Sequence, residues 1–288
     1  MPSFESYGPW AGLALKAVAA SLGAIRNLGA AGRKVVEQRA GDYREWDPEI
    51  IAVDRGAEEE ILRCIRDSGF GGTIISEEAG VVPLEGGSER AYFIVDPFDG
   101  SMLFRRGIPA FWYTCLGIYG EDGEPRAAAV GDAVCGYVEF CDEKGAYRGR
   151  IAGAQVQEVE TLQACGAQDL SEAYIETYLM KPQWMYPACQ QFEPLFKKVK
   201  MILPNGGPGG FADVAAGRVD AYLAIKEAAV EVFNGLPIAL RAGCVVTDYS
   251  GMPVAFSDDI QRQYSLVCSA NRSLHEQILA EISSLRLP

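Results

Sequence analysis

The feature that most constrains this chain is an apolar run that ends abruptly in two acids. Residues 91–95 read AYFIV, which is typical of a buried strand, and DPFDGS follows directly at residues 96–101. The proline stiffens the exit and the glycine permits a tight turn. Asp96, Asp99 and a backbone carbonyl would therefore emerge together at a sheet edge, where oxygen ligands suit Mg²⁺ or Mn²⁺. The alternative is a turn in which both acids bond backbone amides.

A second apolar strand ends in the same way. Residues 73–76 read TIIS and run into Glu77 and Glu78; the alternative here is a solvated acidic pair. Asp54 adds an acid upstream, where an acidic first turn followed by apolar spacing predicts a capped helix. Too few cationic side chains lie nearby in the sequence to pair all these carboxylates. A metal cluster explains that excess, and a fold requirement alone does not.

Length and charge restrict the class of protein. The chain has 288 residues and a formal net charge of −13, which fits two sub-domains or one large two-layer unit. This acidity argues against partners such as nucleic acid or an anionic membrane. The first nine residues lack the cationic cluster of a signal peptide, and residues 10–25 are too short and interrupted to span a bilayer. We expect residues 10–25 to form a buried helix.

Cysteine and histidine usage excludes several kinds of site. The eight cysteines include no CxxC pair, so we expect reduced, mostly buried thiols in a cytoplasmic protein. The single histidine, His275, argues against a zinc site and against a histidine-based triad. It falls in a late helical pattern, where we expect it to be a surface or capping residue.

The remaining segments predict a mixed fold without internal repeats. Three successive strands separated by acidic, glycine-containing turns suggest an antiparallel meander, and the pattern becomes mixed α and β after about residue 151. The expected elements are a loop at 81–90, strands at 112–119, 127–134, 136–140 and 219–225, helices at 190–198 and 232–242, and a glycine-rich turn at 205–210.

Several of these segments together resemble the inositol monophosphatase family, in the branch that includes archaeal-type fructose-1,6-bisphosphatases. The order and spacing match at Asp54, at Ser76-Glu77-Glu78, at DPFDGS and at Gly107-Ile108-Pro109. Further on, VAAGRVDAY at residues 214–222 and AGCVVTD at 242–248 are similar to two later family segments. The resemblance covers roughly residues 54–270. The acidic strand ends are highly specific to the family, and the later segments moderately so.

The resemblance implies a role for each matched residue. Glu77 would coordinate the first of two metals, Asp96 would bridge both, and Asp99 would serve the second. The Phe98 carbonyl would join the first site. Ser101, where the family usually has threonine, keeps the hydroxyl and would activate the attacking water together with Asp54. Glu77, Asp54 and Ser101 are thus the predicted catalytic residues, and the amides of Gly100 and Ser101 would hold phosphate oxygens.

The chain departs from the family pattern on the other side of the implied site. Counting back from the AGCVVTD segment places Glu231 where the family has a metal-binding aspartate, so that ligand is one methylene longer. The usual substrate-side turn reads NGGPGG here, with Asn205 and Gly206 as candidate substrate contacts. Arg218 and Lys226 are possible phosphate or sugar contacts, with solvated surface roles as the alternative.

The resemblance therefore implies a Mg²⁺-dependent, or Mn²⁺-dependent, phosphomonoesterase that hydrolyses a small sugar or polyol phosphate by metal-assisted attack of water. Two alternatives stay open: a fructose-1,6-bisphosphatase or bisphosphate nucleotidase, and a degenerate member acting as a binding or regulatory protein. The implied fold is an α/β (α+β) chain in the layered αβαβα sandwich of sugar phosphatases. An N-terminal α+β part would span residues 1–152 and a C-terminal α/β part residues 153–288. The family also implies a homodimer.

Overall fold

The computed structural model describes residues 2–38 and 48–283. Its α-helices are α1 Pro9–Leu28, α2 Ala52–Arg66, α3 Ser101–Arg106, α4 Pro182–Gln191, α5 Glu193–Phe196, α6 Gly207–Ala215, α7 Ala229–Ala242 and α8 Arg272–Ser283. Its strands are β1 Val35–Gln38, β2 Glu49–Ile51, β3 Gly71–Ser76, β4 Gly80–Leu84, β5 Arg90–Asp99, β6 Tyr113–Gly120, β7 Pro125–Asp132, β8 Val138–Cys141, β9 Ala146–Ala152, β10 Gln155–Leu162, β11 Tyr174–Glu176, β12 Met201–Leu203, β13 Ala221–Ala228, β14 Val245–Asp248 and β15 Gln263–Ser269.

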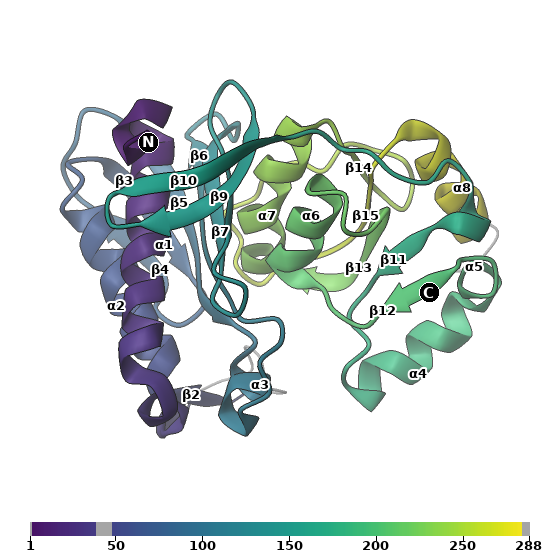
Figure 1. The fold of residues 1–288 in the computed structure, drawn as a ribbon, viewed down its shortest axis with the longest axis horizontal. Helices are drawn as coiled ribbons and strands as arrows, with labels where there is room; N and C mark the ends of the chain where they lie inside the picture. The colour runs from purple at the N-terminus through teal and green to yellow at the C-terminus, as the bar shows by residue number, and fades with distance from the viewer. Residues whose placement is uncertain (1, 39–47, 284–288) are drawn as a thin grey trace.

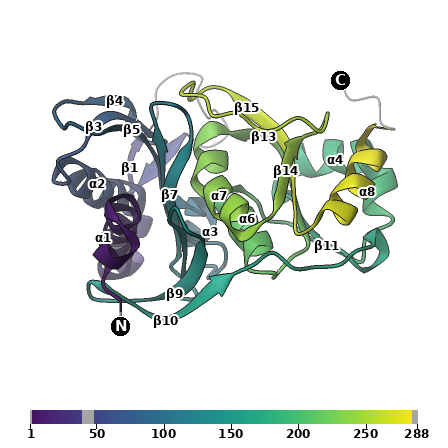
Figure 2. The same cartoon turned by 90° about the horizontal axis from the view of Figure 1, so that it is seen from above.

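These elements stack in five layers, which confirms the predicted αβαβα sandwich. Helices α1 and α2 cover the outer face of a first sheet, α6 and α7 lie between this sheet and a second one, and α4, α5 and α8 lie beyond the second sheet (Figure 1). Figure 2 shows the same order of layers from above. In Figure 1, helix α3 lies at the lower edge of the part that contains the first sheet, and α4 lies at the lower edge of the part that contains the second sheet.

The first sheet has eight strands in the order β10-β9-β8-β7-β6-β5-β3-β4. Strands β5 to β9 form an antiparallel series, as the expected meander required, whereas β3 and β5 pair in parallel. Parallel neighbours end at the same edge, so this one pairing brings both acidic strand ends together. The second sheet has the order β12-β11-β13-β15-β14.

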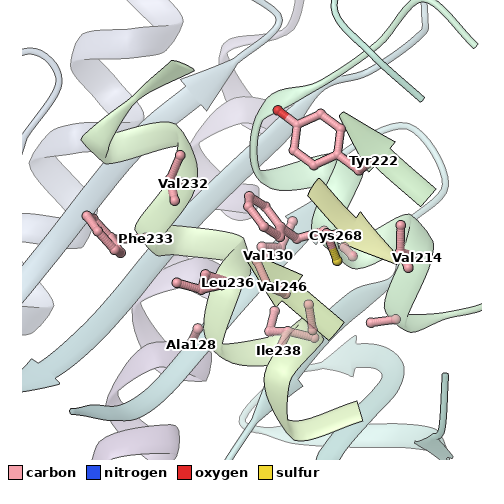
Figure 3. Packing of buried hydrophobic residues seen from close by; sticks show 14 of the residues in the cluster. Ala128, Val130, Val214, Tyr222, Val232, Phe233, Leu236, Ile238, Val246 and Cys268 are labelled. Carbon is pink, nitrogen blue, oxygen red and sulfur yellow. The ribbon is translucent and has the colours of Figure 1, made fainter. Parts of the chain in front are cut away.

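The central helix α7 packs against both sheets in one apolar core. Its residues Val232, Phe233, Leu236 and Ile238 are buried, and Figure 3 shows them packed with side chains from both sheets. These partners include Ala128 and Val130 of β7, Tyr222 of β13, Val246 of β14 and Cys268 of β15. A helix that is apolar nearly all round is typical of a buried central layer. This packing fixes the start of α7, and hence Glu231, relative to the first sheet.

The long first helix was predicted correctly, since α1 spans the expected residues 10–25 and buries its apolar face. The expected loop at 81–90 was wrong for residues 81–84, which belong to β4 and pair antiparallel with β3, and right for residues 85–89, which lie outside the strands. Pro83 is tolerated within β4 because β4 is an edge strand. The glycine-rich turn at 205–210 and the helix at 190–198 were both displaced. Helix α6 already begins at Gly207, and α4 and α5 end at Gln191 and Phe196.

His275 is also not the surface or capping residue that we expected. It is 3% exposed, and its ring nitrogens lie 2.9 Å from Thr247 Oγ1 and 3.1 Å from Ser269 Oγ. Burial lowers the pKa of this imidazole below its usual value. All eight cysteines are free and five of them are buried, as expected. Over the described residues, the structure contains no helix whose length and hydropathy would let it cross a membrane.

Candidate active site

The parallel pairing of β3 and β5 places the two acidic strand ends side by side. The register joins Ile75 to Ile94 and Ser76 to Val95, and the Glu77 amide donates to the Val95 carbonyl over 3.0 Å. Glu77 therefore lies next to the position where Asp96 leaves the strand. The local sequence makes this possible because both apolar runs are buried as central strands up to their final residues.

Three acidic side chains gather around this edge. Glu77 is 7% exposed and Asp96 is 1% exposed. Asp99 lies beyond a register shift in the pairing of β5 with β6. Burial, followed by the charges of Asp96, Asp99 and Glu77, raises the pKa of the Cys115 thiol on β6. Because all three carboxylates act on this one thiol, the three acids predicted to bind metal share one neighbourhood.

The turn after β5 connects this acidic edge to Ser101. Gly100 has a φ of 100°, and a Cβ there would collide with the carbonyl oxygen of Phe111, so the turn requires glycine. Helix α3 begins at Ser101, whose Oγ lies 2.7 Å from Asp54 Oδ1 and 3.0 Å from the Phe98 carbonyl oxygen. The other Asp54 oxygen accepts the Ile51 amide over 2.8 Å and caps α2. The structure thus brings together the predicted Ser101 and Asp54 pair.

A pocket of about 420 Å³ opens over these residues. Eight of the ten predicted site residues line it: Glu77, Phe98, Asp99, Gly100, Ser101, Asn205, Gly206 and Glu231. The other two, Asp54 and Asp96, do not line it. Asp54 lies behind Ser101, to which it is hydrogen bonded, and Asp96 is buried at the end of β5. The pocket volume falls within the range of small-molecule sites in proteins.

The opposite side of the pocket contains two acids: Glu231, which was predicted, and Glu227, which the sequence analysis missed. Glu231 stands in the first turn of α7, where its Oε2 accepts the Ala228 amide over 3.1 Å. Glu227, near the end of β13, also lines the pocket, and its Oε1 accepts the Tyr222 hydroxyl over 3.2 Å. Burial, followed by the Glu231 carboxylate, raises the pKa of Glu227 well above its usual value, and Asp99 acts in the same direction. Glu227 could have been identified from the sequence by its position four residues before Glu231.

The start of α6 closes the pocket beside Asp99. Gly207 has a φ of 65°, and a Cβ there would lie 3.1 Å from Asp99 Oδ2. Its amide donates to the Tyr222 hydroxyl over 2.9 Å. The side-chain amide of the neighbouring Asn205 donates to the buried Glu176 carboxyl. The predicted substrate-side residues Asn205 and Gly206 therefore lie in the pocket wall, with the Asn205 side chain directed toward Glu176.

The two cationic candidates of the sequence analysis lie in different places. Lys226 lines the pocket. Arg218 does not, because its guanidinium forms ion pairs with Asp213 and with Glu139 of β8, the latter at 2.7 Å. Arg218 was thus wrong as a candidate substrate contact. It connects α6 to the first sheet instead.

The donor set of this pocket fits a hard divalent cation by its chemistry. Carboxylates and a backbone carbonyl are the ligands that Mg²⁺ and Mn²⁺ prefer, and they converge here from β3, β5 and α7. Within residues 2–38 and 48–283, however, no three His, Cys, Asp or Glu side chains already form a group able to hold a metal ion. The side chains would therefore have to adjust around a cation, and the assigned ligands stay predictions.

Comparison with known proteins agrees with this fold. The model of the inositol monophosphatase family matches residues 10–287, so the chain belongs to this family. Family membership supports a phosphatase that acts on sugar phosphates.

Individual relatives are distant. A fructose-1,6-bisphosphatase/inositol-1-monophosphatase from Archaeoglobus fulgidus is 26% identical over 246 residues, which is 79% of this chain and 81% of that protein. The Nus factor SuhB of Escherichia coli is 27% identical over 206 residues, which is 70% of this chain and 72% of that protein. Protein PH1897 of Pyrococcus horikoshii, described as similar to inositol-1 monophosphatase, superposes with a TM-score of 0.74 at 24% identity. That match covers 96% of this chain and 99% of PH1897, and it shows the shared fold.

Proposed function

We propose that this protein is a Mg²⁺-dependent phosphomonoesterase that hydrolyses a small sugar or polyol phosphate. The observation that carries the proposal is the hydrogen bond between Ser101 and Asp54 at the edge of a pocket lined by Glu77 and Asp99. A polarised hydroxyl next to hard oxygen ligands is what the attack of water on a phosphate ester requires. Mn²⁺ is an alternative cation with the same ligand preference.

Each residue has a distinct part in this reaction. The Ser101 hydroxyl donates a hydrogen bond to Asp54. As the attacking water gives a proton to the Ser101 oxygen, the Ser101 hydroxyl proton passes to the Asp54 carboxylate. As the water oxygen bonds to phosphorus, the ester P–O bond breaks, and the leaving alkoxide takes a proton from a solvent water molecule, whose hydroxide is neutralised by the proton released at Asp54. Glu77, Asp96, Asp99, Glu231 and the Phe98 carbonyl would hold the cations. Bound cations would supply charge stabilisation to the phosphoryl oxygens.

Glu227 would support Glu231 from outside the ligand set. The two carboxyl groups are hydrogen bonded to each other, and Tyr222 holds Glu227 from the other side. Groups that hydrogen bond to a metal ligand fix its orientation. We propose that Glu227 positions the longer Glu231 side chain, which replaces the aspartate of the family pattern.

A bisphosphate substrate is the second candidate. Lys181 and Lys226 both line the pocket, and two cationic side chains in one cavity favour a second anionic group on the substrate. The Archaeoglobus fulgidus relative, named for both activities, fits either candidate. A homodimer and a cytoplasmic location, both expected from the sequence, stay predictions.

A Mg²⁺ titration of phosphate release tests the function. The panel would include glycerol 1-phosphate, myo-inositol 1-phosphate and fructose 1,6-bisphosphate, with Mn²⁺ in parallel. We expect turnover that requires the cation and that Glu77→Gln abolishes, while the exposed control Glu85→Gln retains it. Preference for the bisphosphate would select the second candidate. No turnover by folded protein at any cation concentration would refute the enzyme and favour a binding or regulatory role.

A further inference from the structure

A chain of buried polar side chains runs from the pocket wall to the first sheet. It begins at Asn205, which lines the pocket and whose side-chain amide donates to Glu176 at the end of β11. Glu176 is hydrogen bonded in turn to Asp213 of α6. Asp213 forms an ion pair with Arg218, which also pairs with Glu139 of β8. The reaction proposed above gives Glu176 no role, although this side chain is fully buried behind a residue of the pocket wall.

The chain contains more acids than cations. Its three buried carboxyl groups are those of Glu139, Asp213 and Glu176, and its guanidinium groups are those of Arg148 and Arg218. Both guanidinium groups approach Glu139, and Arg218 also reaches Asp213. Within the described part of the chain, Glu176 is the acid of the three that has no ion pair. A buried carboxyl group without a cation takes up a proton rather than stay ionised.

The two oxygens of Glu176 show where this proton is needed. Oε1 accepts the Asn205 amide. Oε2 is buried, and no donor among residues 2–38 and 48–283 reaches it. Two ionised carboxylates are acceptors only and cannot hydrogen bond to each other, so Glu176 and Asp213 must hold a proton between them. Asp213 is already paired with Arg218, which assigns the proton to Glu176.

The electrostatic surroundings of Glu176 agree with this assignment. Burial, followed by the charge of Asp213 and the hydrogen bond to it, raises the pKa of Glu176 well above its usual value. The Asn205 amide and the more distant charge of Arg218 act in the opposite direction, with smaller effects. At neutral pH the Glu176 side chain is therefore a carboxylic acid with one donor and one acceptor.

A neutral Glu176 determines which way round the Asn205 amide lies. Its hydroxyl group is used by Asp213, so its carbonyl oxygen remains as an acceptor, which only the NH₂ group of Asn205 can satisfy. The nitrogen and the oxygen of an amide lie on opposite branches of one planar group. Asn205 Oδ1 is therefore directed away from Glu176, and the amide offers an acceptor on its pocket side.

Asn205 also lies near enough to the acids to meet the alcohol part of a bound ester. Gly207, two residues further on, lies beside Asp99, where an added Cβ would be 3.1 Å from Asp99 Oδ2. Two residues span at most about 7 Å of extended chain. A small polyol phosphate held at the acids would therefore place hydroxyl groups within reach of Asn205. A hydroxyl donor there would replace the hydrogen bonds that both groups lose when water leaves the pocket.

We propose that Glu176, as a neutral acid hydrogen bonded to Asp213, is a positioning residue that orients Asn205 Oδ1 to accept a hydrogen bond from a substrate hydroxyl group. This inference rests on the phosphatase function proposed above and deepens it, because it names the group that distinguishes a polyol phosphate from an alkyl phosphate. Gln183, Trp184 and Gln191 of α4 also line the pocket, and the two glutamines would meet further hydroxyl groups.

Matched pairs of phosphate esters test the inference. Glycerol 1-phosphate is compared with propyl phosphate, and myo-inositol 1-phosphate with cyclohexyl phosphate. The members of each pair differ only in the hydroxyl groups of the alcohol. Each variant is compared with the wild type on the same ester at saturating Mg²⁺, so differences in leaving-group chemistry cancel. A loss of hydroxyl recognition should appear in KM for the polyol ester and leave kcat unchanged.

Substitutions at Glu176 separate its hydrogen bonds from its charge. Glu176→Gln keeps a carbonyl acceptor for Asn205 and a donor for Asp213, so KM for the polyol ester should stay within about twofold of the wild type. Glu176→Met removes both hydrogen bonds and should raise that KM by about tenfold, with less than about twofold change for the alkyl ester. Glu85→Met makes the same replacement at an exposed site and should change neither ester.

Asn205→Leu provides an independent route to the same contact. It should raise KM for the polyol ester as Glu176→Met does, and the double variant should lose no more than either single variant, because both break one interaction. Infrared difference spectra between the wild type and Glu176→Gln measure the proton without turnover. We expect the carbonyl band of a protonated carboxylic acid at neutral pH. If Glu176→Met fails to fold, Asn205→Leu and this band carry the test.

The outcomes distinguish this inference from the function beneath it. An equal loss for both esters of a pair in Asn205→Leu would show that Asn205 does not recognise a hydroxyl group and would leave the phosphatase standing. A carboxylate band instead of the acid band, or a Glu176→Gln defect as large as that of Glu176→Met, would overturn the neutral acid. Hydrolysis of no ester by the folded wild type would refute the phosphatase and, with it, this role of Glu176, whatever the infrared band shows.

Discussion

Two glutamates, the buried Glu139 and the partly buried Glu227, show how this molecule treats acidic groups in different ways. Glu139 of β8 is 1% exposed, and Arg218 and Arg148 both approach its carboxylate. Burial raises the pKa of Glu139, and these two guanidinium groups act against that rise. Around Glu227 the strongest influence after burial is a further carboxylate, Glu231, and both raise its pKa; the Tyr222 hydroxyl lowers it, and Asp99 adds a smaller rise.

This difference distinguishes a structural cluster around Glu139 from a functional site around Glu227. At Glu139 the protein supplies cations itself, and the resulting ion pairs connect the first sheet to α6. At Glu227 the fold holds like charges near one another, which is unfavourable unless protons or cations from outside neutralise them. Perturbed acids in a pocket are typical of functional sites, whereas paired acids in the core are typical of structural ones.

The largest effect is expected at the hydroxyl that the pocket acids surround. Ser101→Ala removes the group between Asp54 and the attacking water, so kcat should fall by about 10²–10⁴-fold. Stability should fall by about 1–3 kcal/mol, because the buried Asp54 carboxylate loses a hydrogen-bond donor. Phosphate release and urea denaturation measure the two quantities. Ser101→Thr keeps the hydroxyl and should retain activity. If the alanine variant stays active, Ser101 has no catalytic part.

A substitution in the structural cluster around Glu139 should instead lower stability and leave kcat unchanged. Arg218→Met leaves Glu139 buried without its closest cation, which typically costs about 3–5 kcal/mol. We expect a loss of about 3 kcal/mol, at the lower end of that range, because Arg148 still lies 3.4 Å away. The folded variant should keep the wild-type kcat.

The control for this variant is Arg126→Met, which breaks the exposed i,i+4 pair with Asp122. Such surface pairs contribute about 0–1 kcal/mol. Urea denaturation of both variants gives the comparison directly. Equal destabilisation by the two substitutions would show that Glu139 does not depend on Arg218. The ion pairs around Glu139 would then not be the structural cluster that we contrast with the pocket around Glu227.

Removing the charge of Glu227 should affect cation binding more than folding. Glu227→Gln relieves repulsion among the pocket carboxylates, so the cation-free protein should be as stable as the wild type or more stable. Mn²⁺ affinity should fall by about tenfold, as for other groups that orient metal ligands. Calorimetric titration and thermal melting without added metal measure both. The exposed Glu85→Gln has the same charge change and should alter neither. A less stable cation-free Glu227→Gln protein would mean that Glu227 is structural.

The acidic edge could be predicted from sequence because its determinants are local. Each apolar run ends within one residue of its acids, and parallel pairing of the two strands then brings Glu77 and Asp96 together. Asp54 was found for a similar reason, since it caps its own helix three residues after Ile51. Ser101 follows from the glycine turn between the strand and α3.

Glu227 and the α4 side of the pocket could not be predicted in this way. The pairing of β13 with β15 shifts register between Ala224 and Glu227, and Lys226 has a φ of 56°. Such an irregularity redirects side chains, so simple strand alternation does not give the direction of Glu227. Trp184 faces the pocket because α4 packs at the far side of the second sheet, a tertiary fact that its own residues do not encode. His275 was misplaced likewise, since its partners come from β14 and β15.

The smallest expected effect concerns the ligand that departs from the family pattern. Glu231 reaches into the pocket from the first turn of α7 while its Oε2 also accepts the Ala228 amide. Glu231→Asp shortens the side chain to the usual family length and keeps its charge. If the longer chain weakens the second cation site, the Mg²⁺ concentration for half-maximal rate should decrease, by a factor smaller than the change in Mn²⁺ affinity for Glu227→Gln. A titration of phosphate release against Mg²⁺ measures this. An unchanged requirement would indicate that the fold already positions Glu231 for its cation, with Glu227 holding it in place.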